Sequence, residues 1–157
     1  MSLVIGIDPG LKGGIAKIWD DGVESIPMPI KEGLLDIKTL FAWVEPEITQ
    51  PMDTVVYIER VWAMPKQRGG ERFIKDAGRL LGLFELFDVT PIEVLPKKWK
   101  HGILKAPYDK DAAIAYCDAN FPEISLLATP RSKKPHDGMA DALCIAAYGR
   151  LCEEEKA

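Results

Sequence analysis

The sequence predicts an α/β protein with a mixed central sheet, an antiparallel three-stranded meander at the N-terminus and flanking helices. Two short apolar runs, residues 3–7 and 54–58, each end in one acidic residue. Four later stretches repeat apolar residues at helical spacing. The length of 157 residues is usual for one domain, so residues 1–157 are expected to form a single domain.

The N-terminal stretch VIGIDPGLKGG organises the prediction. Residues 3–7 read as a short buried strand that delivers Asp8, and Pro9 and Gly10 end it. Asp-Pro-Gly is also a common turn sequence in which the aspartate caps the backbone. Asp8 alone therefore indicates a turn or a functional site about equally.

Two further strands complete the meander. The Asp-Gly pair at Asp21 and Gly22 is a strong hairpin signal between strands at residues 13–19 and 23–28. Apolar residues at helical spacing predict a helix over residues 34–44, ended by Pro46.

The β-branched run at residues 54–59 predicts a buried strand that ends at Glu59. Periodicity and capping predict the later elements: a helix at residues 71–87 as the central packing helix, a strand at 90–95, a basic stretch at 96–100, a helix capped by Asp109, and a last helix from about 136 to 151 with a frayed tail at 153–156.

Composition limits the class of protein. The apolar fraction of 47% and the charged fraction of 28% are those of a globular protein. No apolar run is long enough to cross a membrane, and no signal-peptide pattern precedes the first strand, so we expect a cytoplasmic protein without a membrane partner, in a cell or a virus-infected host cell. Cys117, Cys144 and Cys152 form no metal-binding or disulfide pattern and are expected as buried reduced thiols.

The net charge of −4 conceals an uneven distribution. Residues 60–134 hold fourteen Lys/Arg against nine Asp/Glu, and the remaining residues hold six against fifteen. Basic residues therefore gather in the middle of the chain, as a nucleic-acid partner would require.

Asp137 and Asp141 lie four residues apart on the last predicted helix and share one face. The helix dipole accounts for Asp137 near the N-terminus, but Asp141 lies a turn further among small and apolar neighbours. With the two strand-end acids they give four carboxylates, and such hard oxygen ligands suit Mg²⁺ or Mn²⁺. Acids that bind metal ions, surrounded by Lys and Arg residues that bind phosphates, are suited to cleavage of a phosphodiester.

Three stretches, IGIDPGLKGG, YIERVWAMPKQ and KKPHDGMADAL, resemble in order the motifs of RuvC-like Holliday junction resolvases of the ribonuclease H-like superfamily. The four-residue spacing of the last two acids is similar to the mitochondrial and viral branches. The resemblance implies a ribonuclease H-like fold with two Mg²⁺ per active site, for which Mn²⁺ can substitute. It also implies a homodimer that cuts four-way or related branched DNA by paired symmetric nicks, with residues 71–87 as the candidate interface.

The resemblance also implies roles for individual residues. Asp8, Glu59, Asp137 and Asp141 match the metal-binding catalytic acids, and Lys100 and Lys110 resemble basic residues of the catalytic centre. Trp62 falls where the family places an aromatic that stacks on a base. The remaining expected DNA contacts are Arg60, Lys66, Gln67, Arg68, Lys98, Arg131, Lys133 and Lys134. His136 is either a helper at the metal centre or a helix cap.

Two other functions stay open at this point. An actin-like ATPase or phosphotransferase also begins with a strand, an aspartate and glycines, although the chain is short for two such lobes. A non-catalytic junction-binding module would keep the acids only as structural groups. Turnover of ATP without nicking would identify the first, and Mg²⁺-dependent nicking of a synthetic junction would exclude the second.

Overall fold

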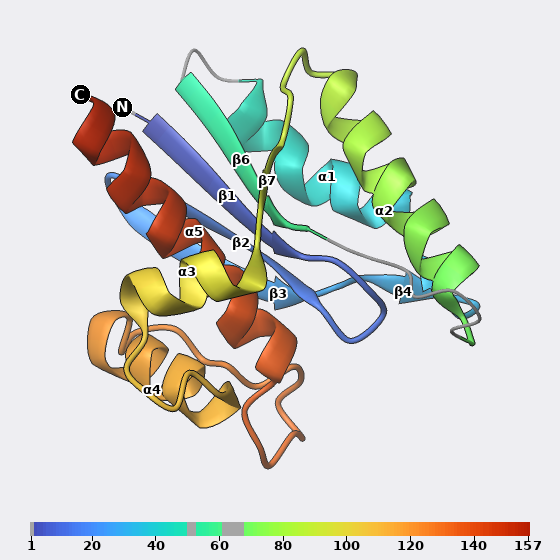
Figure 1. Cartoon of the computed structure of the whole chain (residues 1–157). Coiled ribbons are helices and arrows are strands. Elements are labelled where there is room, and N and C mark those ends of the chain that lie inside the picture. Colours follow the sequence, from blue (N-terminus) through green and yellow to red (C-terminus); the bar gives the residue numbers. More distant parts are fainter. Residues whose placement is uncertain (1, 50–52, 61–67) are drawn as a thin grey trace.

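A five-stranded mixed sheet runs through the centre of the computed structural model, which describes residues 2–49, 53–60 and 68–157 (Figure 1). The strand order is β3-β2-β1-β6-β7. An antiparallel meander is formed by β1 (Ser2–Asp8), β2 (Gly14–Trp19) and β3 (Gly22–Pro27). The sheet continues in parallel from β1 through β6 (Asp53–Glu59) to β7 (Ile92–Val94). The predicted fold class, with its meander, is confirmed.

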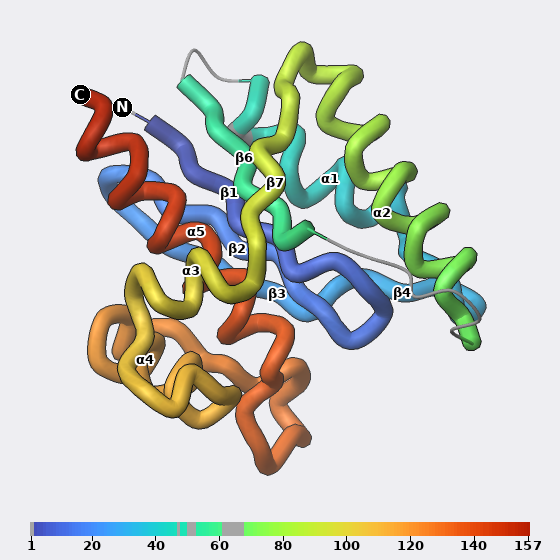
Figure 2. The backbone as a smooth tube through the Cα atoms, viewed as in Figure 1, coloured from blue at the N-terminus to red at the C-terminus, as the bar shows by residue number. Residues whose placement is uncertain are grey.

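Helices cover both faces of the sheet (Figure 1). One face carries α1 (Ile37–Ile48) and α2 (Gly70–Glu85), and the other carries α3 (Pro96–Ile103), α4 (Lys110–Asn120) and α5 (Asp137–Lys156). A small hairpin of β4 (Ile30–Lys31) and β5 (Leu34–Leu35) lies beside the sheet. The tube in Figure 2 shows that the chain completes the α1–α2 face first and crosses to the other face after β7.

The two faces have separate hydrophobic cores because side chains alternate along each strand. Leu3, Ile5 and Ile7 of β1 pack under α1 and α2, whereas Val4 packs under α5. The continuous apolar run of β1 therefore serves both cores, as expected for a strand that is covered on both sides.

The first helix differs from its prediction. Leu34 and Leu35 belong to β5, and the helix begins after Asp36, whose Oδ1 accepts the backbone N–H of Thr39 at 3.2 Å. Pro46 lies inside the helix instead of ending it. It stands near the end, on an exposed part, where the missing N–H removes only one backbone hydrogen bond.

Two further predictions, the frayed tail and the central helix at residues 71–87, were wrong, and one helix was not predicted. The basic stretch from residue 96 is helical (α3), because Pro96 occupies the first turn, where its missing N–H costs nothing. The C-terminal tail is not frayed, since α5 continues to Lys156 and Glu153 accepts the Tyr57 hydroxyl at 2.6 Å. The central helix is α5, which packs along β1 and β2, and not the helix at 71–87.

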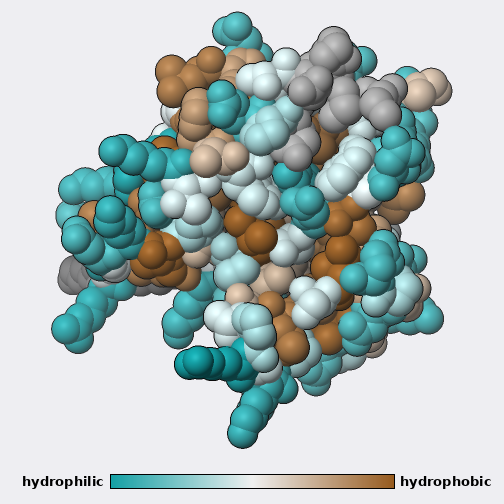
Figure 3. Space-filling view, turned by 180° about the vertical axis from the view of Figure 1, so that it is seen from behind, coloured by the Kyte–Doolittle hydropathy of each residue, from teal (hydrophilic) through white to brown (hydrophobic). Residues whose placement is uncertain are grey.

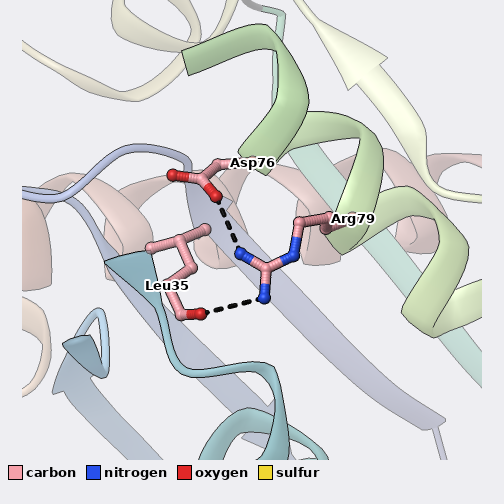
Figure 4. Close-up of polar contacts among 3 residues, drawn as sticks. All are labelled: Leu35, Asp76 and Arg79. Atoms are coloured by element: carbon pink, nitrogen blue, oxygen red, sulfur yellow. Dashed lines mark hydrogen bonds and ion pairs between the residues drawn. The ribbon is translucent and has the colours of Figure 1, made fainter. Parts of the chain in front are cut away.

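A buried polar contact joins α2 to β5 (Figure 4). Asp76 is 3% exposed and accepts a 3.0 Å ion-paired hydrogen bond from Arg79. The second terminal nitrogen of Arg79 donates to the backbone carbonyl of Leu35 at 3.2 Å. The arginine thereby neutralises a buried acid and fixes the position of the small hairpin.

Other sequence expectations concern the surface and the thiols. Within the described residues, no helix is both long and apolar enough to cross a membrane. Cys117, Cys144 and Cys152 are free thiols; Cys117 and Cys144 are buried as predicted, whereas Cys152 is only partly buried. Seen from behind, apolar side chains form several separate areas among hydrophilic ones (Figure 3).

Candidate active site

Asp8 and Glu59 end two neighbouring parallel strands at the same edge of the sheet. The register pairs Ile7 with Ile58, so the next residue of each strand is an acid. Because side chains alternate between the two faces of a strand, both carboxylates point to the face of the sheet that α5 covers. Val4 and Tyr57 face the same side. The strand register alone thus brings the first two predicted acids together.

Glycine allows α5 to approach this edge closely. A Cβ atom at Gly6 would collide with the backbone of Ala142 and Ala146. A Cβ atom at Gly138 would collide with the backbone of the β1–β2 turn at Lys12 and Gly13. The backbone-to-backbone packing brings Asp141 of α5 to the side of the sheet edge that carries Asp8.

An open cavity of about 430 Å³ lies at this edge. Its walls are Asp8, the turn at residues 9–13, Phe73, Lys110, Asp137, Gly138 and Asp141. A larger cavity of about 670 Å³ lies between the end of α3 and α4, and none of the four predicted acids lines it. The smaller cavity, where acidic and basic groups converge, is therefore the candidate site.

The site strongly disfavours charge on its carboxylates. Burial, followed by the charges of Glu59 and Asp141, raises the pKa of Asp8 to about 8. Burial also raises the pKa of Asp141 to about 6, against the opposing effect of Lys100. The pKa of Glu59 is raised by burial, although a hydrogen bond from Trp99 and the charge of Lys100 oppose this. Three acids that repel one another in a buried site favour a bound cation.

The donor set suits a hard divalent cation such as Mg²⁺ or Mn²⁺, because it consists of carboxylate oxygens. The sequence predicts Asp8, Glu59, Asp137 and Asp141 as the acids that would hold it, and this assignment stays a prediction. Within the described part of the chain, no group of three or more His, Cys, Asp or Glu side chains is close enough to hold a metal ion.

The two predicted catalytic lysines both lie at the acids. Lys100 follows the buried Trp99 on α3, and its charge acts on Asp8, Glu59 and Asp141. Lys110, the first residue of α4, forms a 2.7 Å ion pair with Asp137. Both lysines therefore place positive charge beside the acids.

His136 is the N-cap of α5. Its Nδ1 accepts the backbone N–H of Met139 at 3.2 Å, which satisfies one free donor of the first helical turn. The structure therefore shows the capping role that the sequence had left open beside a catalytic one.

Three residues at the site were missed by the sequence reasoning. Trp99 is fully buried and donates its indole Nε1–H to Glu59 at 2.7 Å. Lys12 and Phe73 line the cavity. Lys12 lies inside the motif around Asp8, so its position was a usable signal, whereas nothing in the sequence links Phe73 to that motif.

The predicted DNA-contact residues are only partly described. Trp62, Lys66 and Gln67 lie outside the described residues. The others are exposed: Arg60 at the end of β6, Arg68 before α2, Lys98 on α3, and Arg131, Lys133 and Lys134 in the segment before α5. Exposed positions suit phosphate contacts, and these assignments stay predictions.

Comparison with solved structures shows that the chain has a fold like that of RuvC. No family model and no curated protein sequence matches the chain. Solved structures do: the chain is similar to RuvC of Thermus thermophilus in complex with a Holliday junction substrate, with a TM-score of 0.67, 16% identity and coverage of 99% of this chain and 97% of the other.

A second Thermus thermophilus RuvC structure matches with a TM-score of 0.60 and 15% identity over 98% of this chain and 96% of the other. A fowlpox virus Holliday junction resolvase matches at 17% identity over 99% of both chains, but its TM-score of 0.42 is too low to carry an argument. The RuvC-like fold implied by the sequence motifs is confirmed, and the likeness to the viral branch stays a prediction.

Proposed function

We propose that the protein is a divalent-metal-dependent endonuclease that resolves Holliday junctions or related branched DNA by paired symmetric nicks. One observation carries this proposal: Asp8, Glu59 and Asp141 come from three elements to one edge of the sheet, where the charges of Glu59 and Asp141 both raise the pKa of the buried Asp8. A merely solvated set of surface acids would not be buried in this way.

In the proposed site, Asp8, Glu59, Asp137 and Asp141 hold two Mg²⁺ ions, for which Mn²⁺ substitutes. Bound divalent cations supply Lewis-acid stabilisation of the phosphodiester and activation of water. The four acids would hold the cations, and Lys100 and Lys110 would offset negative charge at the scissile phosphate and leaving oxygen. The expected products carry a 5′-phosphate and a 3′-hydroxyl.

The proposed substrate is branched DNA with four arms. The solved complex of Thermus thermophilus RuvC contains a Holliday junction substrate, and its fold supports the same partner here. The exposed lysines and arginines of residues 60–134 provide the sequence-independent attraction that DNA requires.

Paired nicks also require two active sites, which a homodimer supplies. The α2 region is the proposed interface, but only part of its apolar surface is free for it. Leu80, Leu83 and Phe84 are buried in the core of one chain, whereas Ile74 and Leu86 are 50% and 79% exposed. The exposed residues are the ones that a second copy could cover.

The test compares nicking of a mobile junction, a fixed junction, a Y-fork and linear duplex with Mg²⁺, with Mn²⁺ and with neither. We expect metal-dependent, paired nicks that are strongest on the four-way junctions, and Asp8→Asn should bind the junction but not cut it. Asp8→Asn that cuts at the wild-type rate would overturn the site. Binding without nicking would favour the junction-binding module, and ATP turnover without nicking would favour the actin-like alternative.

A further inference from the structure

Trp99 makes a short polar contact with one of the four acids, Glu59. Its indole Nε1–H donates to Oε2 of Glu59 at 2.7 Å, and the side chain is fully buried. A buried indole N–H requires an acceptor, and a carboxylate is a strong one. The contact therefore restricts both partners.

The fold places this contact by the same register that places the acids. Glu59 pairs with Val94 of β7, and the chain enters α3 directly after that strand. The backbone N–H of Trp99 donates to Leu95, the N-cap, at 3.3 Å, so the indole belongs to the first turns of the helix. Val94 and Trp99 join the core under α5, which fixes α3 beside the end of β6.

A carboxylate has two oxygens and about four lone-pair sites. The indole uses one site on Oε2, so Oε1 and the remaining lone pairs stay available for a cation. Holding one oxygen also reduces the number of rotamers that Glu59 can adopt. Residues that orient metal ligands in this way commonly change metal affinity or activity by about 10- to 100-fold when they are lost.

We propose that Trp99 is a positioning residue: its indole N–H fixes the orientation of the Glu59 carboxylate for divalent cation binding at the candidate site. This inference rests on the proposed function, because it assigns a cation to that site. Trp99 acts through Glu59, with no contact to DNA required of it.

The test uses Trp99→Phe, which keeps an aromatic ring in the core and removes the N–H donor. Trp43→Phe is the matched control, because Trp43 lies on α1 on the opposite face of the sheet, where Lys17 stands 4.3 Å above its ring. Mn²⁺ affinity is measured by titration calorimetry, and junction nicking is resolved into kcat and KM. We expect about tenfold weaker Mn²⁺ binding for Trp99→Phe and a fall in kcat of about 10- to 100-fold with KM unchanged. Unchanged Mn²⁺ affinity, or an equal loss in Trp43→Phe, would overturn the proposal.

A second measurement needs no change at Trp99. The indole N–H resonance of Trp99 is observed by nuclear magnetic resonance in the wild type and in Glu59→Gln. It should shift when Mg²⁺ is added to the wild type and should differ in Glu59→Gln, whereas the Trp43 resonance stays in place. A Trp99 resonance that responds to neither change refutes the proposal even if Trp99→Phe does not fold.

The two proposals can fail separately. Weaker Mn²⁺ binding in Trp99→Phe in a protein that cuts no DNA supports the positioning role and refutes the nuclease. Metal-dependent nicking that is unaffected in Trp99→Phe supports the nuclease and refutes the positioning role.

Discussion

Lys110 and Asp137 form a 2.7 Å ion pair between the first residues of α4 and α5, at the wall of the acidic cavity. The hydrogen bond and charge of Asp137 raise the pKa of Lys110 and so favour its charged form further. Both side chains are substantially exposed, 74% for Lys110 and 43% for Asp137. Such an exposed pair contributes little to the free energy of unfolding. Its effect is to hold the Lys110 ammonium group at the cavity wall.

Lys110→Gln should therefore separate catalysis from stability. We expect nicking to fall by about 100-fold, because one group that offsets charge at the phosphate is lost, while the melting temperature is unchanged. Lys105→Gln, in the preceding loop and outside the cavity wall, is the control and should cut normally. Nicking at the wild-type rate by Lys110→Gln would contradict the proposed catalytic role of Lys110.

The stability of the metal-free protein should decrease as the pH rises. The pKa of Asp8 is about 8 and that of Asp141 about 6 in the folded chain, against 3.8 when unperturbed. Between about pH 4 and 8 the folded state therefore binds more protons than the unfolded state, and the free energy of unfolding falls through this range, by about 3 kcal/mol or more.

Urea unfolding in EDTA at about pH 5, 7 and 9 measures this slope. Asp8→Asn should remove most of the slope above pH 7, because the buried group can no longer ionise. Asp21→Asn, in the exposed β2–β3 turn, should keep the wild-type slope. A wild-type stability that does not change between these pH values would contradict the buried acidic cluster.

Mg²⁺ should reverse this loss of stability. A cation that binds only the folded state adds about 2.7 kcal/mol at 100 times its Kd. Protons compete for the same carboxylates, so thermal denaturation should show a larger Mg²⁺ effect at about pH 8 than at pH 6. The same effect in Asp8→Asn would place the cation elsewhere.

Gly6→Ala and Gly78→Ala should change stability in opposite directions. A methyl group at Gly6 would collide with the backbone of α5, and overpacking of this kind costs about 1–3 kcal/mol or more. Gly78 lies on α2 with no atom within 4 Å of a new Cβ, so alanine there should stabilise the helix by about 0.5–1 kcal/mol. Equal effects in chemical denaturation would contradict the close packing of α5 on β1.

Arg79→Met should destabilise the fold without removing any group from the cavity wall. Asp76 would remain buried without its ion-pair partner, at a cost of about 1–3 kcal/mol. The double variant Asp76→Leu with Arg79→Met should recover part of the loss, because an apolar pair leaves no unsatisfied charge. Chemical denaturation of the three variants provides the comparison, and a fully stable Arg79→Met would show that the contact is dispensable.

Much of the arrangement could be predicted because it depends on local patterns. The apolar run of β1, the Asp-Gly turn and the β-branched run of β6 each specify an element, and parallel pairing then places Asp8 beside Glu59. The i,i+4 spacing similarly places Asp137 and Asp141 on one face of α5.

The remainder depends on contacts between distant residues. The charges of residues 96–100 indicate a basic surface stretch. They give no sign that Trp99 is buried against Glu59, which lies forty residues earlier in the chain. The pairing of Lys110 with Asp137 depends on how α4 packs on α5. Likewise, Pro46 is a strong stop signal, but the sequence could not show that it would fall on an exposed part of the helix near its end.

The position of α5 in the chain has a consequence for biosynthesis. A nascent chain that has left the ribosome only as far as α4 contains Asp8 and Glu59 but neither Asp137 nor Asp141. In such a chain, the face of β1 and β2 on which α5 packs is also uncovered. The acidic site therefore comes into existence only after the last element is synthesised and docked, so no shorter translation product that ends before α5 can carry a complete site.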